Sequence, residues 1–150
     1  MYHFIVKRTI RRSFRNLSHG DYETVLKLFS PSVRFAFAGE HALGGEQQGV
    51  EAVRLWFQRL YRLLPGLRFE VQNVLVNGWP WNTVAATHFI VRTVFDDGRS
   101  YTNAGVQIIR LRWGRIVEDY LYEDTQKLVA ELQYRAGRGI QEAVAAPISR

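Results

Sequence analysis

Apolar positions in the first half of the chain recur every three or four residues, the spacing of one helix face. These stripes predict a helix over about residues 4–17 and another over 49–63, which Pro65 and Gly66 end. Between them, Asp21 is a predicted N-cap for a short helix that ends at Pro31. The stripe residues are Val6, Ile10, Phe14 and Leu17 in the first helix, Val25, Leu26, Leu28 and Phe29 in the second, and Val53, Trp56, Phe57, Leu60 and Leu64 in the third.

The pattern then changes to an alternation of period two, which is typical of strands. The predicted strands cover residues 33–37, 67–76, 83–95, 101–113 and 114–124, with turns at Asn77-Gly78, Asp97-Gly98 and Trp113-Gly114. The glycine-rich segment 40–49 is predicted to be a lid or a connector, and Asp124 is predicted to cap a last helix over 125–135. Helices followed by consecutive antiparallel strands indicate an α+β fold, with N-terminal helices packed on one face of a curved sheet.

One face of this sheet is predicted to mix apolar residues with a few polar ones. By alternation we assign to it His88, Arg92, Asn103, Gln107, Asp119 and Leu121. Such polar groups are too few for a solvated face and too many for a plain core, which is the composition of a ligand pocket. A carboxylate among apolar neighbours has a raised pKa unless a cation compensates it, and His88 or Arg92 is the candidate cation. We therefore expect Asp119 and His88 to form a catalytic acid–base pair. A buried ion pair that only satisfies itself is the alternative.

Other residues are candidates for binding a substrate next to this pair. They are Phe35 and Phe37 on the first strand, His41 in the glycine-rich segment, and Trp56 and Tyr61 on the third helix, together with Arg92, Asn103, Gln107 and Leu121. Aromatic residues at helical spacing are also typical of a plain core. The same positions therefore predict either pocket walls or core packing.

The opposite face of the sheet is predicted to be largely apolar. We assign Phe89, Val91, Val106 and Ile108 to it. A monomer would expose these residues as a broad apolar patch, and an identical subunit is the simplest partner to cover it. We therefore expect a homodimer.

Composition narrows the remaining classes. The net charge of +6 is concentrated on the first helix, in Lys7, Arg8, Arg11, Arg12 and Arg15. A basic helix can bind a membrane surface or nucleic acid, but we favour a solvated face and expect no nucleic-acid partner. The chain has no cysteine, which excludes disulfides and thiolate metal sites and is compatible with a cytoplasmic location. No apolar run is long enough for a membrane span, and the four histidines lack ligand spacing, so we expect neither a metal nor another cofactor.

Three motifs resemble the SnoaL-like branch of the nuclear transport factor 2-like superfamily. They are the helix start at Gly49 to Val53, the DGRSYTN turn at 97–103 and the strand GRIVEDYLYED at 114–124. The resemblance covers about residues 4–135 of a single domain over 1–150, with a C-terminal tail from residue 137. It implies a cone-shaped α+β barrel, usually a homodimer through the outer sheet face. Relatives include ketosteroid isomerases, polyketide cyclases and limonene epoxide hydrolases.

The catalytic residues of those relatives are not conserved here. The positions that limonene epoxide hydrolases use correspond to His88, Ile90 and Leu121, with Phe35 and Phe37 in place of the assisting tyrosine and asparagine. The acid of SnoaL-type cyclases also corresponds to Leu121. Two function classes therefore stay open. One is a cofactor-independent isomerase, cyclase or hydrolase acting on a steroid-, terpene- or polyketide-like molecule, and the other is a non-catalytic ligand-binding or dimerisation module.

Overall fold

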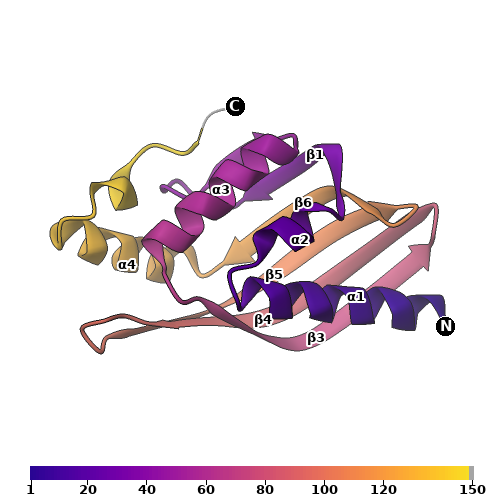
Figure 1. Cartoon of the computed structure of the whole chain (residues 1–150), viewed down its shortest axis with the longest axis horizontal. Helices are drawn as coiled ribbons and strands as arrows, with labels where there is room; N and C mark the ends of the chain where they lie inside the picture. Colours follow the sequence, from indigo (N-terminus) through magenta and orange to yellow (C-terminus); the bar gives the residue numbers. More distant parts are fainter. Residues whose placement is uncertain (149–150) are drawn as a thin grey trace.

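The structure, a computed structural model that describes residues 1–148, is a curved six-stranded sheet with helices on one face (Figure 1). The elements along the chain are α1 (Tyr2–Leu17), α2 (Tyr22–Leu26), β1 (Phe29–Phe37), β2 (Gly45–Gln48), α3 (Val50–Leu63), β3 (Arg68–Trp79), β4 (Asn82–Val94), β5 (Ser100–Arg112), β6 (Arg115–Glu123), α4 (Thr125–Gly137) and the short 3₁₀ helix η1 (Gln141–Val144). The strand order is β2-β1-β6-β5-β4-β3. Within residues 1–148, the β1–β6 pair is the only parallel one, and the other neighbouring strands are antiparallel. The predicted α+β fold is confirmed.

Two aspartates begin helices as the sequence predicted. The Asp21 carboxylate accepts a hydrogen bond from the backbone N–H of Thr24 at 3.1 Å, and Asp124 accepts one from the N–H of Lys127 at 3.2 Å. Each bond satisfies one of the N–H groups that the first turn of a helix leaves free. Asp124 thereby fixes the point at which β6 ends and α4 begins.

The segments on either side of β1 differ from the prediction. The second helix ends at Leu26, and Phe29 and Pro31 belong to β1. Pro31 is tolerated in this strand because the β1–β6 register is irregular between Phe29 and Arg34, where no ladder N–H is required of it. The segment predicted as a lid or connector contains the short edge strand β2.

The first turn of the meander also lies later than predicted. Strand β3 continues through Asn77 and Gly78 to Trp79, and the reversal falls at Pro80 and Trp81. Gly78 has φ of 97°, and a Cβ on it would lie 2.2 Å from the carbonyl oxygen of Asn82. Position 78 therefore requires glycine because two strand ends approach each other closely there, and not because the chain turns there.

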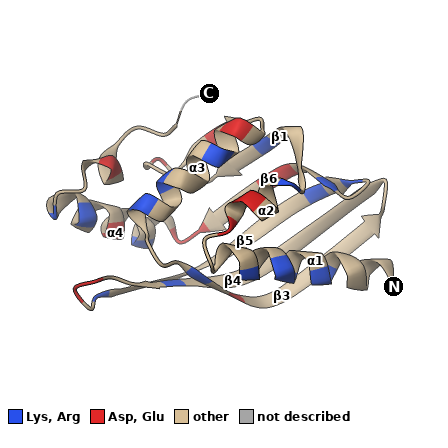
Figure 2. Ribbon diagram, in the orientation of Figure 1, with Lys and Arg blue, Asp and Glu red and all other residues tan. Residues whose placement is uncertain are grey.

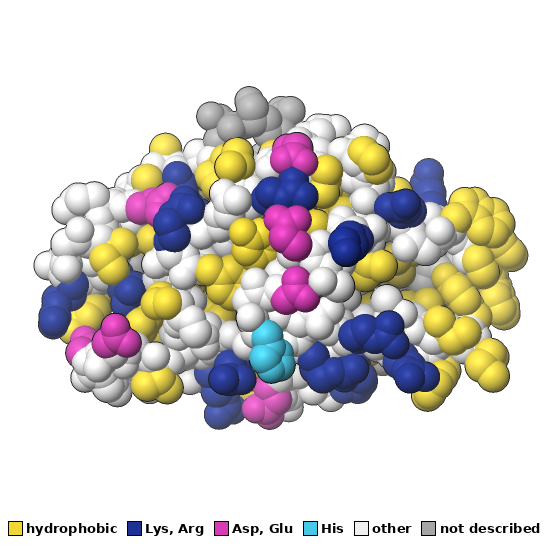
Figure 3. Space-filling view, in the orientation of Figure 1, with side chains coloured by type: hydrophobic (Ala, Val, Ile, Leu, Met, Phe, Trp, Pro, Cys, Tyr) yellow, Lys and Arg dark blue, Asp and Glu magenta, His cyan; other side chains and the backbone are white. Residues whose placement is uncertain are grey.

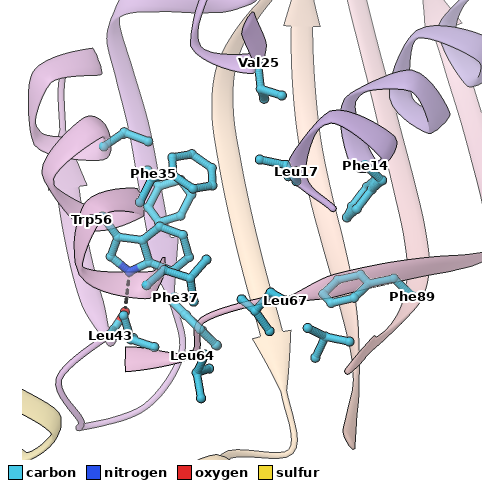
Figure 4. Close-up of a cluster of buried hydrophobic side chains, with 14 of the residues drawn as sticks. Phe14, Leu17, Val25, Phe35, Phe37, Leu43, Trp56, Leu64, Leu67 and Phe89 are labelled. Carbon is cyan, nitrogen blue, oxygen red and sulfur yellow. Dashed lines mark hydrogen bonds between the residues drawn. The ribbon is translucent and has the colours of Figure 1, made fainter. Parts of the chain in front are cut away.

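The core lies between the sheet and helices α1, α2 and α3. Figure 4 shows Phe35, Phe37 and Trp56 gathered on one side of this space and Phe14 and Phe89 on the other. The indole N–H of Trp56 donates a hydrogen bond to the carbonyl oxygen of Leu43 at 2.7 Å. Aromatic side chains thus narrow the cone from both sides.

The two faces of β4 are the reverse of those assigned from the sequence. Phe89 and Val91 are buried under the helices, whereas His88 lies on the outer face. The β4–β5 register pairs Thr87 with Gln107 and His88 with Val106. The predicted outer face was therefore wrong for Phe89 and Val91. It was right for Val106 and Ile108, which point away from the helices.

Candidate functional site

Asp119 is the most deeply buried carboxylate on the inner face of the sheet. Its side chain is 2% exposed and lies on β6 between the β1 residue Phe35 and the β5 residue Ile109. The Gln107 amide donates to Asp119 Oδ2 at 3.3 Å, and Oδ1 has no hydrogen-bond partner among the described residues. Asp119 therefore points into the cone, as alternation predicted, with one carboxylate oxygen free.

Burial sets the protonation of this group. Removal from water raises the pKa of Asp119 from 3.8 to about 7, and the hydrogen bond from Gln107 opposes the shift only in part. No ion pair with Asp119 occurs within residues 1–148. A carboxyl group with a pKa near 7 is present in both protonation states at neutral pH, which suits a group that both accepts and returns a proton.

Two cavities meet at this carboxylate. The inner one, about 40 Å³, reaches from Asp119 past Leu121 and Glu123 to Leu128 on α4. The outer one, about 250 Å³, lies between α1, α2 and the sheet. Phe14, Leu17, Phe57, Gln107 and Asp119 line both cavities. The inner cavity has room for about three water molecules, at about 10–15 Å³ each, so the larger chamber is the one that can hold an organic molecule.

A second carboxyl group, that of the half-buried Glu123, lines the inner cavity. Burial raises the pKa of Glu123 from 4.5 to about 7. The Asn103 amide lies 3.4 Å from Glu123 Oε1 and donates to the Tyr101 hydroxyl at 2.8 Å and the Asp124 carbonyl at 3.1 Å. Glu123 is not among the site residues predicted from the sequence. Its spacing, two residues after Leu121 and four after Asp119, was the available signal, because alternation places all three on one face.

Gly105 on β5 makes room for this second group. A Cβ on Gly105 would lie 2.7 Å from Glu123 Cγ, 2.7 Å from Phe89 Cζ and 2.8 Å from the Tyr122 carbonyl oxygen. Glu123 and Phe89 therefore occupy the space that a side chain at position 105 would fill.

The structure brings together five further residues that the sequence predicted for the pocket. Phe35, Phe37, Trp56, Gln107 and Leu121 all line the inner cavity. Asn103 is buried on the same sheet face and contacts the cavity residue Glu123. These residues form the wall around the two carboxyl groups.

Four predicted site residues lie elsewhere. His88 and Arg92 are exposed on the outer face, where Arg92 forms an ion pair with Glu70 at 3.7 Å, so neither can pair with Asp119. The Tyr61 hydroxyl donates to the Leu17 carbonyl at 2.5 Å, and its ring stacks on Tyr22 between helices. That contact makes Tyr61 a packing residue.

His41 also serves the structure around it and does not line either cavity. Its Nδ1 accepts a hydrogen bond from the Leu43 N–H at 3.2 Å, so Nε2 carries the proton and donates to the Ala38 carbonyl at 3.2 Å. Burial lowers the pKa of His41. This neutral ring lies edge-on to Phe37 and lines a separate groove against α4.

Within residues 1–148, no cluster of three or more His, Asp or Glu side chains is arranged to hold a metal ion. The same residues include no helix that is long and apolar enough to span a bilayer.

Comparison with known proteins agrees with this architecture. The sequence profile of the SnoaL-like domain family matches residues 10–119, more than half of the chain. No curated protein matches the sequence. The resemblance drawn from the three motifs is therefore confirmed at the level of the family.

Several solved structures share the fold. An NTF2-like protein of unknown function from Burkholderia pseudomallei is 24% identical over 83% of this chain and 94% of that chain, with a TM-score of 0.68. IdmH from Streptomyces antibioticus, proposed to be a polyketide cyclase, is 22% identical over 85% and 97% of the two chains, with a TM-score of 0.67. AclR from Streptomyces galilaeus, proposed to be a hydroxylase, is 17% identical over 88% and 95%, with a TM-score of 0.64. At these identities the similarity shows the fold alone.

Proposed function

We propose that this chain, which belongs to the SnoaL-like domain family, binds a compact apolar, oxygenated molecule in its cone and transfers a proton on it through Asp119. One observation carries the proposal: a buried carboxyl group has a free oxygen at the junction of two cavities. In its ionised form Asp119 takes a proton from a carbon beside a carbonyl group, or from a hydroxyl group. In its protonated form it returns the proton.

Gln107 supports this exchange. Its amide N–H donates to Asp119 Oδ2, which stabilises the ionised form and leaves Oδ1 for the ligand. The largely apolar wall disfavours the charged form of the carboxyl group, so its pKa lies close to neutral pH. Isomerisation, cyclisation and hydrolysis each include such a proton transfer.

The cavity size restricts the ligand. Pockets for drug-sized ligands span about 300–1,000 Å³, and the outer chamber of about 250 Å³ lies just below that range. A terpene-sized or single-ring polyketide-like molecule suits this volume better than a steroid.

Asp119→Asn tests the proposal. Compact oxygenated terpenoids and cyclic ketones are screened first by thermal shift, since a ligand at about 100 times its Kd stabilises the folded state by about 2.7 kcal/mol. With a ligand in hand, Asp119→Asn should retain binding and lower turnover by about 10²–10⁴-fold. Glu118→Gln, one residue away on the outer face, is the matched control and should retain turnover. Equal turnover in Asp119→Asn and the unmodified protein would rule out the catalytic role.

A non-catalytic binding module is the second candidate, and the narrowing of the cone favours it. Phe35, Phe37 and Trp56 line the inner cavity, which both carboxyl groups border and which measures only about 40 Å³. A ligand that binds without any conversion, in the unmodified protein and in Asp119→Asn alike, would select this function.

We also propose that the chain acts as one cytoplasmic domain that pairs with a second copy through the outer sheet face. Val106, Ile108 and Ile90 lie on that face. A monomer exposes these apolar side chains to water, and a second copy would cover them. This supports a homodimer.

A further inference from the structure

Three of the four tryptophans lie together at one end of the molecule. Trp79, Trp81 and Trp113 are 57%, 57% and 73% exposed. The ring centroids of Trp79 and Trp81 are 6.5 Å apart, and those of Trp81 and Trp113 are 6.4 Å apart. The β3–β4 and β5–β6 turns carry them, and the Trp113 N–H donates to the Pro80 carbonyl at 2.7 Å, which holds the turns side by side. Tryptophan is usually well buried, so three exposed rings in one cluster indicate a contact surface.

The start of α1 extends this cluster. Phe4 is 63% exposed and Ile5 is 52% exposed. The His3 ring lies 5.9 Å from the Trp79 ring, and its Nε2 lies 2.8 Å from the Gly78 carbonyl, so α1 begins against the β3–β4 turn. Figure 3 shows hydrophobic side chains gathered at the end of the molecule where α1 begins. We call Phe4, Ile5, Trp79, Trp81 and Trp113 the tryptophan tip.

Basic side chains lie next to the tip and along α1, and acidic side chains are absent from the segments that form the tip. Arg112 and Arg115 flank Trp113, and α1 carries the exposed residues Lys7, Arg8, Arg11, Arg12 and Arg15 (Figure 2). The sequence has no Asp or Glu in residues 1–20, 71–95 or 99–117. The apolar stripe of α1 is buried in the core, so the helix presents its basic face to the exterior. The resulting surface pairs exposed tryptophans with uncompensated positive charge.

We propose that the tryptophan tip and the basic face of α1 dock on an anionic membrane surface. Tryptophan rings favour the headgroup level of a bilayer, and each Lys or Arg near an anionic surface contributes to binding. The outer cavity reaches the same end of the molecule, since Tyr2, Ile5 and Gly114 line it. Docking places the mouth of that cavity against the lipid, where an apolar ligand dissolves. The docking surface itself does not depend on the reaction at Asp119.

Vesicle binding of the full chain tests this surface. The probes are vesicles of phosphatidylcholine alone and vesicles in which a third of the lipid is phosphatidylglycerol. The protein should bind the anionic vesicles selectively, with a blue-shifted tryptophan emission that brominated lipid quenches. Arg8→Gln/Arg11→Gln/Arg12→Gln should weaken binding by about a hundredfold at low salt. Trp81→Ser/Trp113→Ser should weaken it by about tenfold and remove most of the quenching.

Matched controls change the same residue types away from the tip. Leu55→Ser removes an exposed apolar side chain from α3, and Arg68→Gln/Lys127→Gln/Arg138→Gln removes three exposed charges from β3, from α4 and from the residue that follows α4. Both should bind vesicles as the unmodified protein does, and circular dichroism confirms the fold of every variant.

Three outcomes would overturn the proposal. One is vesicle binding that is equally strong with and without anionic lipid, or equally strong in the unmodified protein and in Trp81→Ser/Trp113→Ser. Another is a lack of vesicle binding together with duplex DNA binding that the arginine variant loses, which would assign the basic face to nucleic acid. The third is a change of molecular mass by light scattering in Trp81→Ser/Trp113→Ser with vesicle binding intact, which would make the tip a contact between copies.

Discussion

Replacing Asp119 with Asn should stabilise the folded protein, and the gain should grow with pH. Asn has nearly the same shape as Asp and carries no charge at any pH. The Asp119 carboxylate is buried without an ion pair in the described chain, and its one hydrogen bond comes from Gln107. The ionised side chain therefore opposes folding, and the substitution removes that opposition.

The size of the effect follows from the pKa. Burial raises the pKa of Asp119 from 3.8 to about 7. Between these values the folded state binds more protons than the unfolded state, so the free energy of unfolding falls as pH rises through this window. A shift of about three units, at 1.36 kcal/mol each, gives a loss of about 4 kcal/mol by pH 8. Asp119→Asn should therefore be close to neutral near pH 4 and more stable than the unmodified protein by up to about 4 kcal/mol near pH 8.

Urea unfolding at a series of pH values from about 4 to about 8 measures this difference. Glu118→Gln is a sharp control, since Glu118 is the neighbouring residue on the opposite face. A hydrogen bond from Tyr120 and contacts with Arg110 lower the pKa of Glu118, so its contribution to stability is lost as pH falls. The two variants should thus show opposite pH trends.

Two results would refute the reasoning. One is an Asp119→Asn variant that is less stable than the unmodified protein near pH 8, which would mean that the carboxylate has a compensating partner. The other is a stability difference that does not change with pH, which would mean that the group is hydrated and titrates normally.

Two further substitutions test the geometry. Gly105→Ala should destabilise the fold by about 1–3 kcal/mol in thermal or urea unfolding. The reason is that the new Cβ would lie 2.7 Å from Glu123 Cγ and from Phe89 Cζ. An unchanged unfolding midpoint would show that these side chains move aside at no cost. Val106→Lys should convert the dimer to a folded monomer, as measured by light scattering, whereas Phe89→Lys should unfold the chain because Phe89 is buried. A Val106→Lys variant that stays dimeric would place the interface elsewhere.

The elements with strong periodicity could be predicted from the sequence. The α1 stripe, the helix caps at Asp21 and Asp124, and the strand at 115–123 all agree with the structure. The predicted turn at Asn77-Gly78 is wrong, since both residues belong to β3. The same dipeptide suits a tight turn and a close approach of two strands. Local sequence does not distinguish these uses, since the neighbouring strand decides between them.

The error at His88 has a different cause. Alternation gives the two faces of a strand but not which one is buried, and both faces of β4 contain apolar residues. Cross-strand register supplies the missing information: a hairpin in which Val94 pairs with Ser100 also pairs Thr87 with Gln107. Assigning Gln107 to the pocket therefore assigns Thr87 and Phe89 to it and excludes His88. The predicted pair of Asp119 and His88 is therefore wrong, because this register places His88 on the outer face.

Because His88 lies outside the cone, it does not compensate the charge of Asp119. A structural carboxylate in a protein interior is normally paired with a cation or saturated with hydrogen bonds. Among the described residues Asp119 has neither, since one oxygen accepts a single bond at 3.3 Å and the other accepts none. Glu123, four residues further along the same strand face, is a second, half-buried carboxyl group whose pKa is raised to about 7. Two such groups lower the stability of the folded state at neutral pH. Carboxyl groups with raised pKa values are typical of sites that transfer protons, and this supports the role proposed for Asp119.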